Sequence, residues 1–236
     1  MKHAWILLLP LLTACIGPPP GPMGPPLGEK SVNPGVNENF LAPDMSVDEF
    51  VDRFEGESRE ISANAAGIVD ALGLRRGDEV ADIGSGTGLF VQALCDRVDQ
   101  SGTVYAVDIS PRFLEHLRQR KVREALYPVE VVEGTARSVE LEPRSVDVAL
   151  VVDTYHHFEY PQNTLWSLRR AIRPGGYLYV VDFERIPGVT REWLLDHVRA
   201  DKETFRSEIE AAGFTFVEEI EVPGLVENYM LRFRRL

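Results

Sequence analysis

The feature that most constrains the fold is an alternation of short apolar runs with amphipathic stretches from about residue 60 to the C-terminus. Seven apolar runs are typical of buried strands: residues 79–83, 103–107, 129–132, 146–152, 177–183, 214–222 and 226–233. The stretches between them are typical of helices: residues 61–72, 89–98, 111–125, 162–172 and 202–212. Strands that alternate with helices form parallel sheets with helices on both faces. The sequence therefore predicts a doubly wound α/β fold.

The last two predicted strands are connected differently from the others. Only a short turn centred on Pro223 and Gly224 lies between them. Parallel strands need a crossover of a dozen or more residues, so these two strands are expected to pair in the antiparallel sense. The predicted fold is therefore a mostly parallel sheet that ends in a C-terminal antiparallel hairpin.

The N-terminal segment has the features of an export signal rather than of a folded element. A short basic start is followed by an apolar run over residues 4–12, which is too short to span a bilayer. The run ends in Leu12-Thr13-Ala14-Cys15, which resembles the bacterial lipobox, in which the cysteine becomes lipidated. We therefore expect residues 1–15 to be a lipoprotein-type signal peptide.

The mature protein would then be held at the membrane of the cell envelope through Cys15. A cytoplasmic location is the alternative if the leader is not used.

The next thirty residues lack the composition of a core. Residues 17–28 are almost entirely proline and glycine, which favours an extended tether. Turn signals continue to residue 45, and Ser46 is typical of a helix start. The expected organisation is a tether and irregular segment over residues 16–45, followed by one domain over residues 46–236.

Charge and cysteine content narrow the class of partner. Lys and Arg total 25 against 37 Asp and Glu, which gives a formal net charge of -12. A chain this acidic does not favour nucleic acid as a partner and favours a small molecule. The two cysteines, Cys15 and Cys95, do not form a zinc-binding spacing, and no metal ion is expected.

A glycine-rich loop joins the first predicted strand to the following helix. It contains Gly84, Gly86 and Gly88 directly after Asp82. Glycines let the backbone approach a ligand closely, and the next strand ends at Asp108, where a carboxylate can accept hydrogen bonds from a ribose diol. The third glycine comes one position earlier than in the dinucleotide fingerprint, and Asp82 would repel a pyrophosphate. The loop therefore favours a nucleoside ligand that carries an ammonium group.

These residues resemble the motifs of class I S-adenosylmethionine-dependent methyltransferases of the small-molecule type. Residues 82–88 resemble motif I, residues 106–110 the following acidic motif, residues 151–158 motif IV, and residues 173–176 the turn before the fifth strand. The resemblance implies a Rossmann-like seven-stranded sheet in the order 3-2-1-4-5-7-6, with S-adenosyl-L-methionine as cofactor. It also implies a set of cofactor-binding residues: Asp82, Gly84, Ser85, Gly86, Thr87, Gly88, Asp108, Ile109, Thr135, Ala136 and Asp153. Thr135 stands where the family often has an aspartate.

The end of the fourth predicted strand is the expected substrate side. Asp153, Tyr155, His156 and His157 follow that strand at the sheet edge where ligands bind. Adjacent side chains of an extended chain point in opposite directions, so His156 and His157 are not expected to bind one metal ion together. Asp153, Tyr155 and His156 are the predicted catalytic residues, with His156 facing a small-molecule methyl acceptor.

Two alternative functions stay open at this stage. One is a nicotinamide-dependent oxidoreductase, although the late third glycine and the Tyr-x-x-x-Lys pair of such enzymes are absent. The other is an exported methyltransferase-like domain that binds a nucleoside or another ligand without catalysis. The identity of the acceptor and the oligomeric state do not follow from the sequence.

Overall fold

A computed structural model describes residues 24–57 and 59–236 of the chain. The predicted signal peptide and the lipidation at Cys15 lie outside these residues. The described part contains one seven-stranded sheet in the order β3-β2-β1-β4-β5-β7-β6. Its strands are β1 (Glu79–Ile83), β2 (Thr103–Asp108), β3 (Val129–Glu133), β4 (Val146–Val152), β5 (Ile172–Phe183), β6 (Phe214–Glu219) and β7 (Asn228–Arg235).

Strand directions confirm the predicted fold class. β1 to β5 pair in parallel, whereas β7 is antiparallel to both β5 and β6. The chain moves outward in one direction through β2 and β3, then returns to the middle of the sheet and moves the other way through β4 and β5. The order reverses between β1 and β4, and the carboxyl ends of these strands are the place where doubly wound sheets bind ligands.

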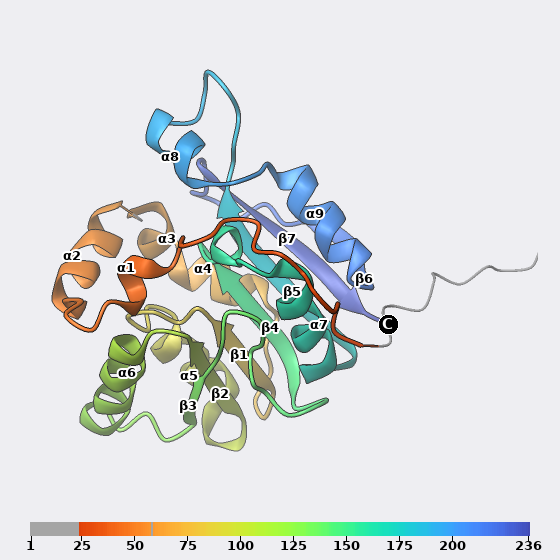
Figure 1. Ribbon diagram of the computed structural model, residues 1–236. Coiled ribbons are helices and arrows are strands. Elements are labelled where there is room, and N and C mark those ends of the chain that lie inside the picture. Colours follow the sequence, from red (N-terminus) through yellow and green to blue (C-terminus); the bar gives the residue numbers. More distant parts are fainter. Residues whose placement is uncertain (1–23, 58) are drawn as a thin grey trace, which may run out of the picture.

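Helices cover both faces of this sheet (Figure 1). They are α1 (Glu38–Leu41), α2 (Val47–Glu57), α3 (Arg59–Ala63), α4 (Ala65–Ala71), α5 (Val91–Val98), α6 (Pro111–Arg123), α7 (Pro161–Ala171), α8 (Glu192–His197) and α9 (Lys202–Ala211). Two short 3-10 helices complete the described elements, η1 (Asp99–Ser101) and η2 (Tyr155–His157).

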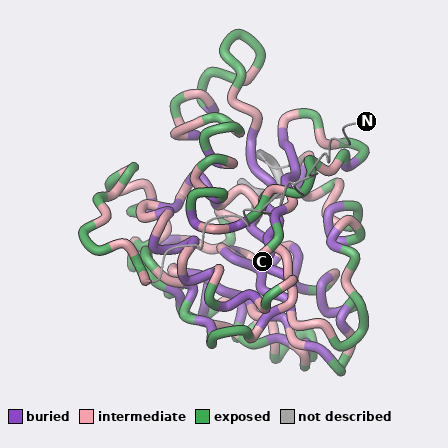
Figure 2. Tube along the Cα trace, turned by 90° about the vertical axis from the view of Figure 1, so that its right-hand side faces the viewer, coloured by how far each residue is buried: buried purple, intermediate pink, exposed green. Residues whose placement is uncertain are grey.

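The core has two parts because successive strand residues face opposite sides of the sheet. Val148 and Leu150 pack in the part that holds residues of α4, α5 and α6. Ala149 and Val151 pack in the part that holds residues of α7 and α9. Buried segments accordingly fill the interior of the trace, with exposed loops around it (Figure 2).

Two connections differ from the sequence prediction. The helix expected over residues 61–72 is divided at Asn64 into α3 and α4. The link between β6 and β7 runs over residues 220–227, although the hairpin itself is antiparallel as predicted. The two places lie in contact: Gly224, with φ +99°, lies directly against the Asn64 side chain, and Val222 of the same link is buried in the core. The longer link thus packs against the break between α3 and α4.

The described residues before residue 46 pack against the domain. The carboxylate of Glu29 accepts hydrogen bonds from the backbone of Gln162 and Asn163, both at 2.8 Å. Asn37 Nδ2 donates to the carbonyl of His157 at 3.0 Å, and the Ser110 hydroxyl donates to the carbonyl of Phe40 at 2.6 Å. Figure 1 shows this segment, in red and orange, lying across one end of the sheet before α1. The domain division at residue 46 stays a prediction.

Within residues 24–57 and 59–236, no helix combines the length and the apolar character needed to cross a bilayer.

Candidate functional site

A pocket opens where the strand order reverses. It encloses about 1230 Å³ of space, part of it open to solvent. Its walls come from the glycine-rich loop, the ends of β2, β3 and β4, and the segment around α1. Ten of the predicted site residues line it: Asp82, Gly84, Ser85, Gly86, Thr87, Asp108, Ile109, Thr135, Ala136 and Asp153. The fold therefore brings residues from four separate strand ends into one cavity.

The glycine-rich loop owes its shape to backbone conformations that favour glycine. Gly84, Gly86 and Gly88 have φ values of 72°, 54° and 82°. A Cβ at Gly84 would lie 2.3 Å from Cγ2 of Thr154 in the pocket wall, so the loop lies close against that wall only because the side chain is missing. A Cβ at Gly88 would instead meet Leu117 of α6 at 2.8 Å. Gly88 therefore makes room for helix packing, and it does not line the pocket.

Two buried carboxylates stand on either side of this loop. The Asp82 carboxylate accepts a 2.6 Å hydrogen bond from the Ser85 hydroxyl. The Asp108 carboxylate accepts hydrogen bonds of 2.8 Å from the backbone N–H groups of Gly86 and Ser110. These contacts tie the loop to the end of β2 and fix both carboxylates at the pocket wall.

Burial raises the pKa of both carboxyl groups. For Asp82 the pKa rises to about 6, opposed by the Ser85 hydrogen bond and reinforced by the charge of Asp108. For Asp108 the rise is opposed by hydrogen bonds from backbone N–H groups, including those of Ser110 and Gly86. Because burial penalises their charged forms, both groups favour a ligand that brings positive charge or hydrogen-bond donors.

Part of the pocket wall is apolar. Ile109 and Ala136, both predicted, stand there with Phe113 of α6 and Val139. Thr135 pairs with Ser138 through its backbone N–H, which donates to the Ser138 carbonyl at 2.8 Å. Such a wall suits a flat heterocycle. Asn37 and Phe40 also line the pocket. They could not be predicted from the sequence, because nothing in the irregular segment indicated that it would fold back over the sheet.

Asp153 is the predicted catalytic residue that lines the pocket. It follows β4 directly with φ 47°, a left-handed conformation that glycine, asparagine and aspartate adopt more readily than other residues. Its backbone N–H donates to the carbonyl of Val181 at 2.9 Å, and its Oδ1 accepts a 2.7 Å hydrogen bond from Asn228 Nδ2. Contacts with β5 and β7 thus hold the carboxylate at the end of the strand.

Tyr155 and His156, the other two predicted catalytic residues, are buried and do not line the pocket. The Tyr155 hydroxyl donates to Glu208 Oε2 at 3.0 Å, and burial raises the pKa of the phenol well above its ordinary value. His156 Nδ1 lies 2.8 Å from Oδ1 of Asp182. Burial lowers the pKa of His156, but Asp182 opposes this and the result is a raised pKa. The catalytic roles of the two residues stay predictions.

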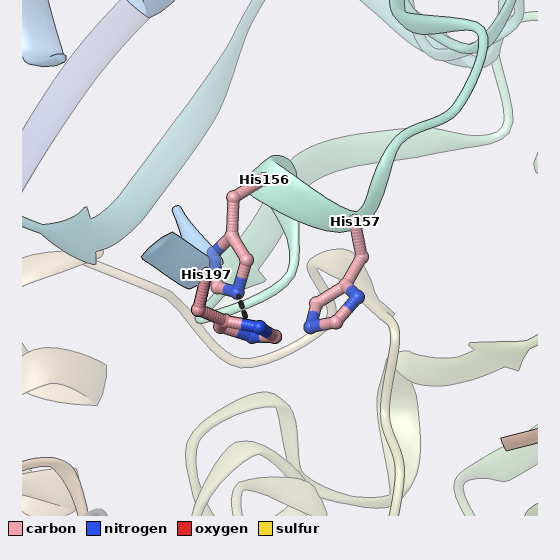
Figure 3. Close-up of side chains that lie close together, drawn as sticks. All are labelled: His156, His157 and His197. Carbon is pink, nitrogen blue, oxygen red and sulfur yellow. Dashed lines mark hydrogen bonds between the residues drawn. The ribbon is translucent and has the colours of Figure 1, made fainter. Parts of the chain in front are cut away.

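The expected orientation of the two adjacent histidines is wrong. Residues 155–157 form the 3-10 helix η2 and not an extended chain. The rings of His156 and His157 therefore lie close together, with centroids 4.4 Å apart, and both lie beside His197 of α8 (Figure 3). His157 lines the pocket and His156 lies behind it.

Comparison with protein families gives one match that bears on this site. Residues 81–180, a little under half of the chain, match the family model described as a methyltransferase domain. These residues include the glycine-rich loop, Asp108 and Asp153, which are the parts of the chain that build the pocket.

Two relatives illustrate the similarity at the level of sequence. The chain is 36% identical over 111 residues to an uncharacterised 37.1 kDa protein in a transposon of Streptomyces fradiae, over 47% of this chain and 32% of that protein. It is 24% identical over 185 residues to a ubiquinone/menaquinone biosynthesis C-methyltransferase of Idiomarina loihiensis, over 66% of this chain and 74% of the relative. The chain thus spans about a third of the first relative and about three quarters of the second.

Solved structures share the fold. A SAM-dependent methyltransferase from Aquifex aeolicus superimposes with a TM-score of 0.67 at 22% identity, over 73% of this chain and 90% of the other. At this identity the likeness concerns the fold. Together with the matched domain model, it supports a methyltransferase and implies S-adenosylmethionine as the cofactor.

Proposed function

We propose that this protein transfers a methyl group from S-adenosylmethionine to a small-molecule acceptor bound in front of Asp153. The observation that carries the proposal is one pocket that joins Asp82 and Asp108, on either side of the glycine loop, to Asp153 across the point where the strand order reverses. A cofactor held by Asp82 and Asp108 would occupy the same pocket as the third carboxylate, Asp153.

The pocket residues fit this cofactor. The loop residues Gly84 and Gly86 line the pocket, and their positive φ values bring the backbone to the pocket wall, where a ligand can contact it. Asp108 is placed to accept hydrogen bonds from the ribose hydroxyls, and the buried Asp82 is placed to receive the ammonium group. The apolar wall of Ile109 and Ala136 suits the adenine. S-adenosylmethionine supplies a methyl group already activated by a positive sulfur, so the protein must mainly align donor and acceptor.

Asp153 is proposed as the general base for an acceptor that arrives protonated. Its carboxylate takes the acceptor's proton while the acceptor atom forms a bond to the methyl carbon. The bond between that carbon and sulfur breaks at the same time, and its electron pair stays on the sulfur. The products are the methylated acceptor, S-adenosylhomocysteine and a protonated Asp153.

A pH dependence of cofactor binding follows from the pKa of about 6 at Asp82. Below that pH the free protein carries a proton on Asp82, which binding of the ammonium group must displace. Affinity for S-adenosylmethionine should therefore be nearly constant from pH 7 to just above 6 and then fall by up to about tenfold per pH unit. The ligand's ammonium group is largely protonated at and below pH 7, since α-amino groups titrate near about 7.7–8.0.

Titration calorimetry between pH 5 and pH 7 measures this dependence. The variant Asp82→Asn is the control, because it removes the titrating group and should bind more weakly with a flatter pH profile. Equal affinity for the wild-type protein at pH 5 and pH 7 would show that Asp82 does not meet the ammonium group.

A location in the cell envelope is proposed on the sequence of the N-terminal segment alone. Leu12-Thr13-Ala14-Cys15 predicts a protein in the membrane fraction, lipidated on Cys15. Cell fractionation of wild-type protein and of Cys15→Ala should show the wild type with the membranes and the variant unlipidated. Recovery of both at full length in the soluble cytoplasmic fraction would refute the export proposal.

A further inference from the structure

Three histidine side chains meet beside the pocket. His156 and His157 come from η2, and His197 comes from the end of α8. One ring nitrogen of each lies within 4.8 Å of the other two, as Figure 3 illustrates. Within residues 24–57 and 59–236, this is the one group of three or more potential ligand side chains so arranged. The proposed methyl transfer uses none of the three.

His156 is oriented as metal-bound histidines usually are. Its Nδ1 lies 2.8 and 3.1 Å from the two carboxylate oxygens of Asp182. That carboxylate is fixed in turn by the backbone N–H groups of His156 and Phe183, at 3.2 and 2.8 Å. When Nδ1 donates its proton to Asp182, the lone pair of the histidine is on Nε2. A carboxylate behind the ligand also fixes the ring and makes the nitrogen more basic.

The opposite nitrogen of His156 faces a second histidine. Its Nε2 lies 3.2 Å from Nε2 of His197. A tetrahedral ion with bonds of about 2.0–2.1 Å to nitrogen holds two such atoms about 3.3 Å apart. The spacing therefore suits two ligands of one ion. Without an ion, one nitrogen donates its proton to the other, and metal binding replaces that proton.

Aromatic rings enclose the cluster on several sides. The Phe183 ring centroid lies 6.0 Å from that of His156, Trp193 lies 6.2 Å from His197, and Phe40 lies 5.2 Å from His157. His156 is 1% exposed. Such packing limits the movement of the imidazoles and the access of water. Binding of one ion then requires the third nitrogen, now within 4.8 Å of the other two, to move inward toward a pair that already has a suitable spacing.

We propose that His156, His157 and His197 bind one divalent first-row transition metal ion, with Asp182 orienting His156. Imidazole ligands suit zinc, copper, iron and nickel, and three protein ligands leave a tetrahedral ion one position for another molecule. His157 lines the pocket, so that position is within reach of a bound acceptor. Resting on the proposed function, this inference narrows the acceptor to a molecule that offers a hydroxyl or enol oxygen. Metal coordination would lower the pKa of that group before methyl transfer.

Zinc binding by the purified full chain, made without a histidine tag and stripped with a chelator, tests the metal site. Zn²⁺ should bind at one ion per chain, measured by calorimetry and by elemental analysis of the dialysed protein. His197→Ala should weaken binding at least about hundredfold, and Asp182→Asn about 10- to 100-fold, as expected for loss of a partner behind a ligand. The control His116→Ala changes a histidine on α6, outside the cluster, and should bind as the wild type does.

The design separates loss of binding from loss of fold. His197→Gln keeps a polar side chain of similar length and serves as a second variant, and melting temperatures are compared without metal. Substitution with Co²⁺ should give the visible absorption of a tetrahedral nitrogen-ligated ion, absent in both His197 variants. Less than half an ion per wild-type chain, or equal affinity in wild type and both folded His197 variants, would overturn the proposed site.

These experiments need neither S-adenosylmethionine nor an acceptor, so the two proposals fail separately. Zinc binding without cofactor binding would refute the proposed function and leave the metal site. For the acceptor, removal of the metal should abolish methyl transfer to a hydroxyl-bearing molecule, and added Zn²⁺ should restore it. Full activity of the stripped protein would exclude a metal-bound acceptor.

Discussion

Replacement of Asp153 by asparagine is expected to lower the turnover of methyl transfer by about 10²–10⁴-fold, the usual contribution of a general base. Asparagine tolerates the left-handed conformation of this residue, φ 47°, and its carbonyl oxygen can still accept the hydrogen bond from Asn228. The substitution thus removes the proton acceptor and keeps the local structure. Affinity for S-adenosylmethionine should stay within about threefold of the wild-type value, since less than 1 kcal/mol of binding is at stake.

Initial-rate kinetics with an acceptor found by screening, together with calorimetry, measure both quantities. Asp147→Asn is the matched control: it makes the same chemical change at the opposite end of β4, far along the strand from the pocket, where Asp147 pairs with Arg173. That control should retain wild-type turnover. Unchanged turnover in Asp153→Asn, with normal folding, would remove Asp153 from the chemistry and leave alignment of the two substrates as the source of catalysis.

Replacement of Asp108 by alanine is expected to weaken binding of S-adenosylmethionine by about tenfold to hundredfold, because a hydrogen bond to a charged group contributes about 1.5–3 kcal/mol. The carboxylate also accepts hydrogen bonds from the backbone of Gly86 and Ser110, so part of the loss could come from a relaxed loop. The measurement must therefore separate the contact with ribose from the shape of the loop.

A ligand without the ribose 2′-hydroxyl makes this separation. The wild-type protein should bind the deoxy ligand more weakly than the natural one, whereas Asp108→Ala should discriminate between the two much less. Equal discrimination in both proteins would show that Asp108 shapes the loop and does not contact the ribose. The melting temperature of the variant checks that the remainder of the domain is folded.

The parts of the fold that could be predicted from the sequence are those set by local patterns. β1 and β4 were predicted at their observed bounds because continuous apolar runs between turn residues indicate buried strands. Ser110 followed by Pro111 is likewise a local signal for a helix start, and in the structure the Ser110 hydroxyl caps α6 by accepting a hydrogen bond from the Phe113 N–H. The break at Asn64 was not predicted, and there the Asn64 side chain packs against Gly224, which is distant in sequence.

Among the site residues, too, those set by local patterns could be predicted and those that depend on distant contacts could not. Asp82, Asp108 and Asp153 were identified because each lies at or within one residue of the carboxyl end of a strand, and parallel strand ends meet at one edge. Phe40 was missed because its place in the pocket depends on packing of the N-terminal segment. The relation of His156 to His197 was also missed, because it needs both the turn of η2 and the position of α8. Contacts between distant segments leave no periodic signal in a sequence.

The most direct test of the central claim is titration calorimetry of the purified protein with S-adenosylmethionine, S-adenosylhomocysteine and NAD. The proposed site predicts saturable binding of both adenosyl ligands at one per chain and no binding of NAD. This follows from Asp82, whose carboxylate favours an ammonium group and repels a pyrophosphate, and from a loop shaped by Gly84 and Gly86. Saturable binding of NAD, with no response to either adenosyl ligand, would contradict it.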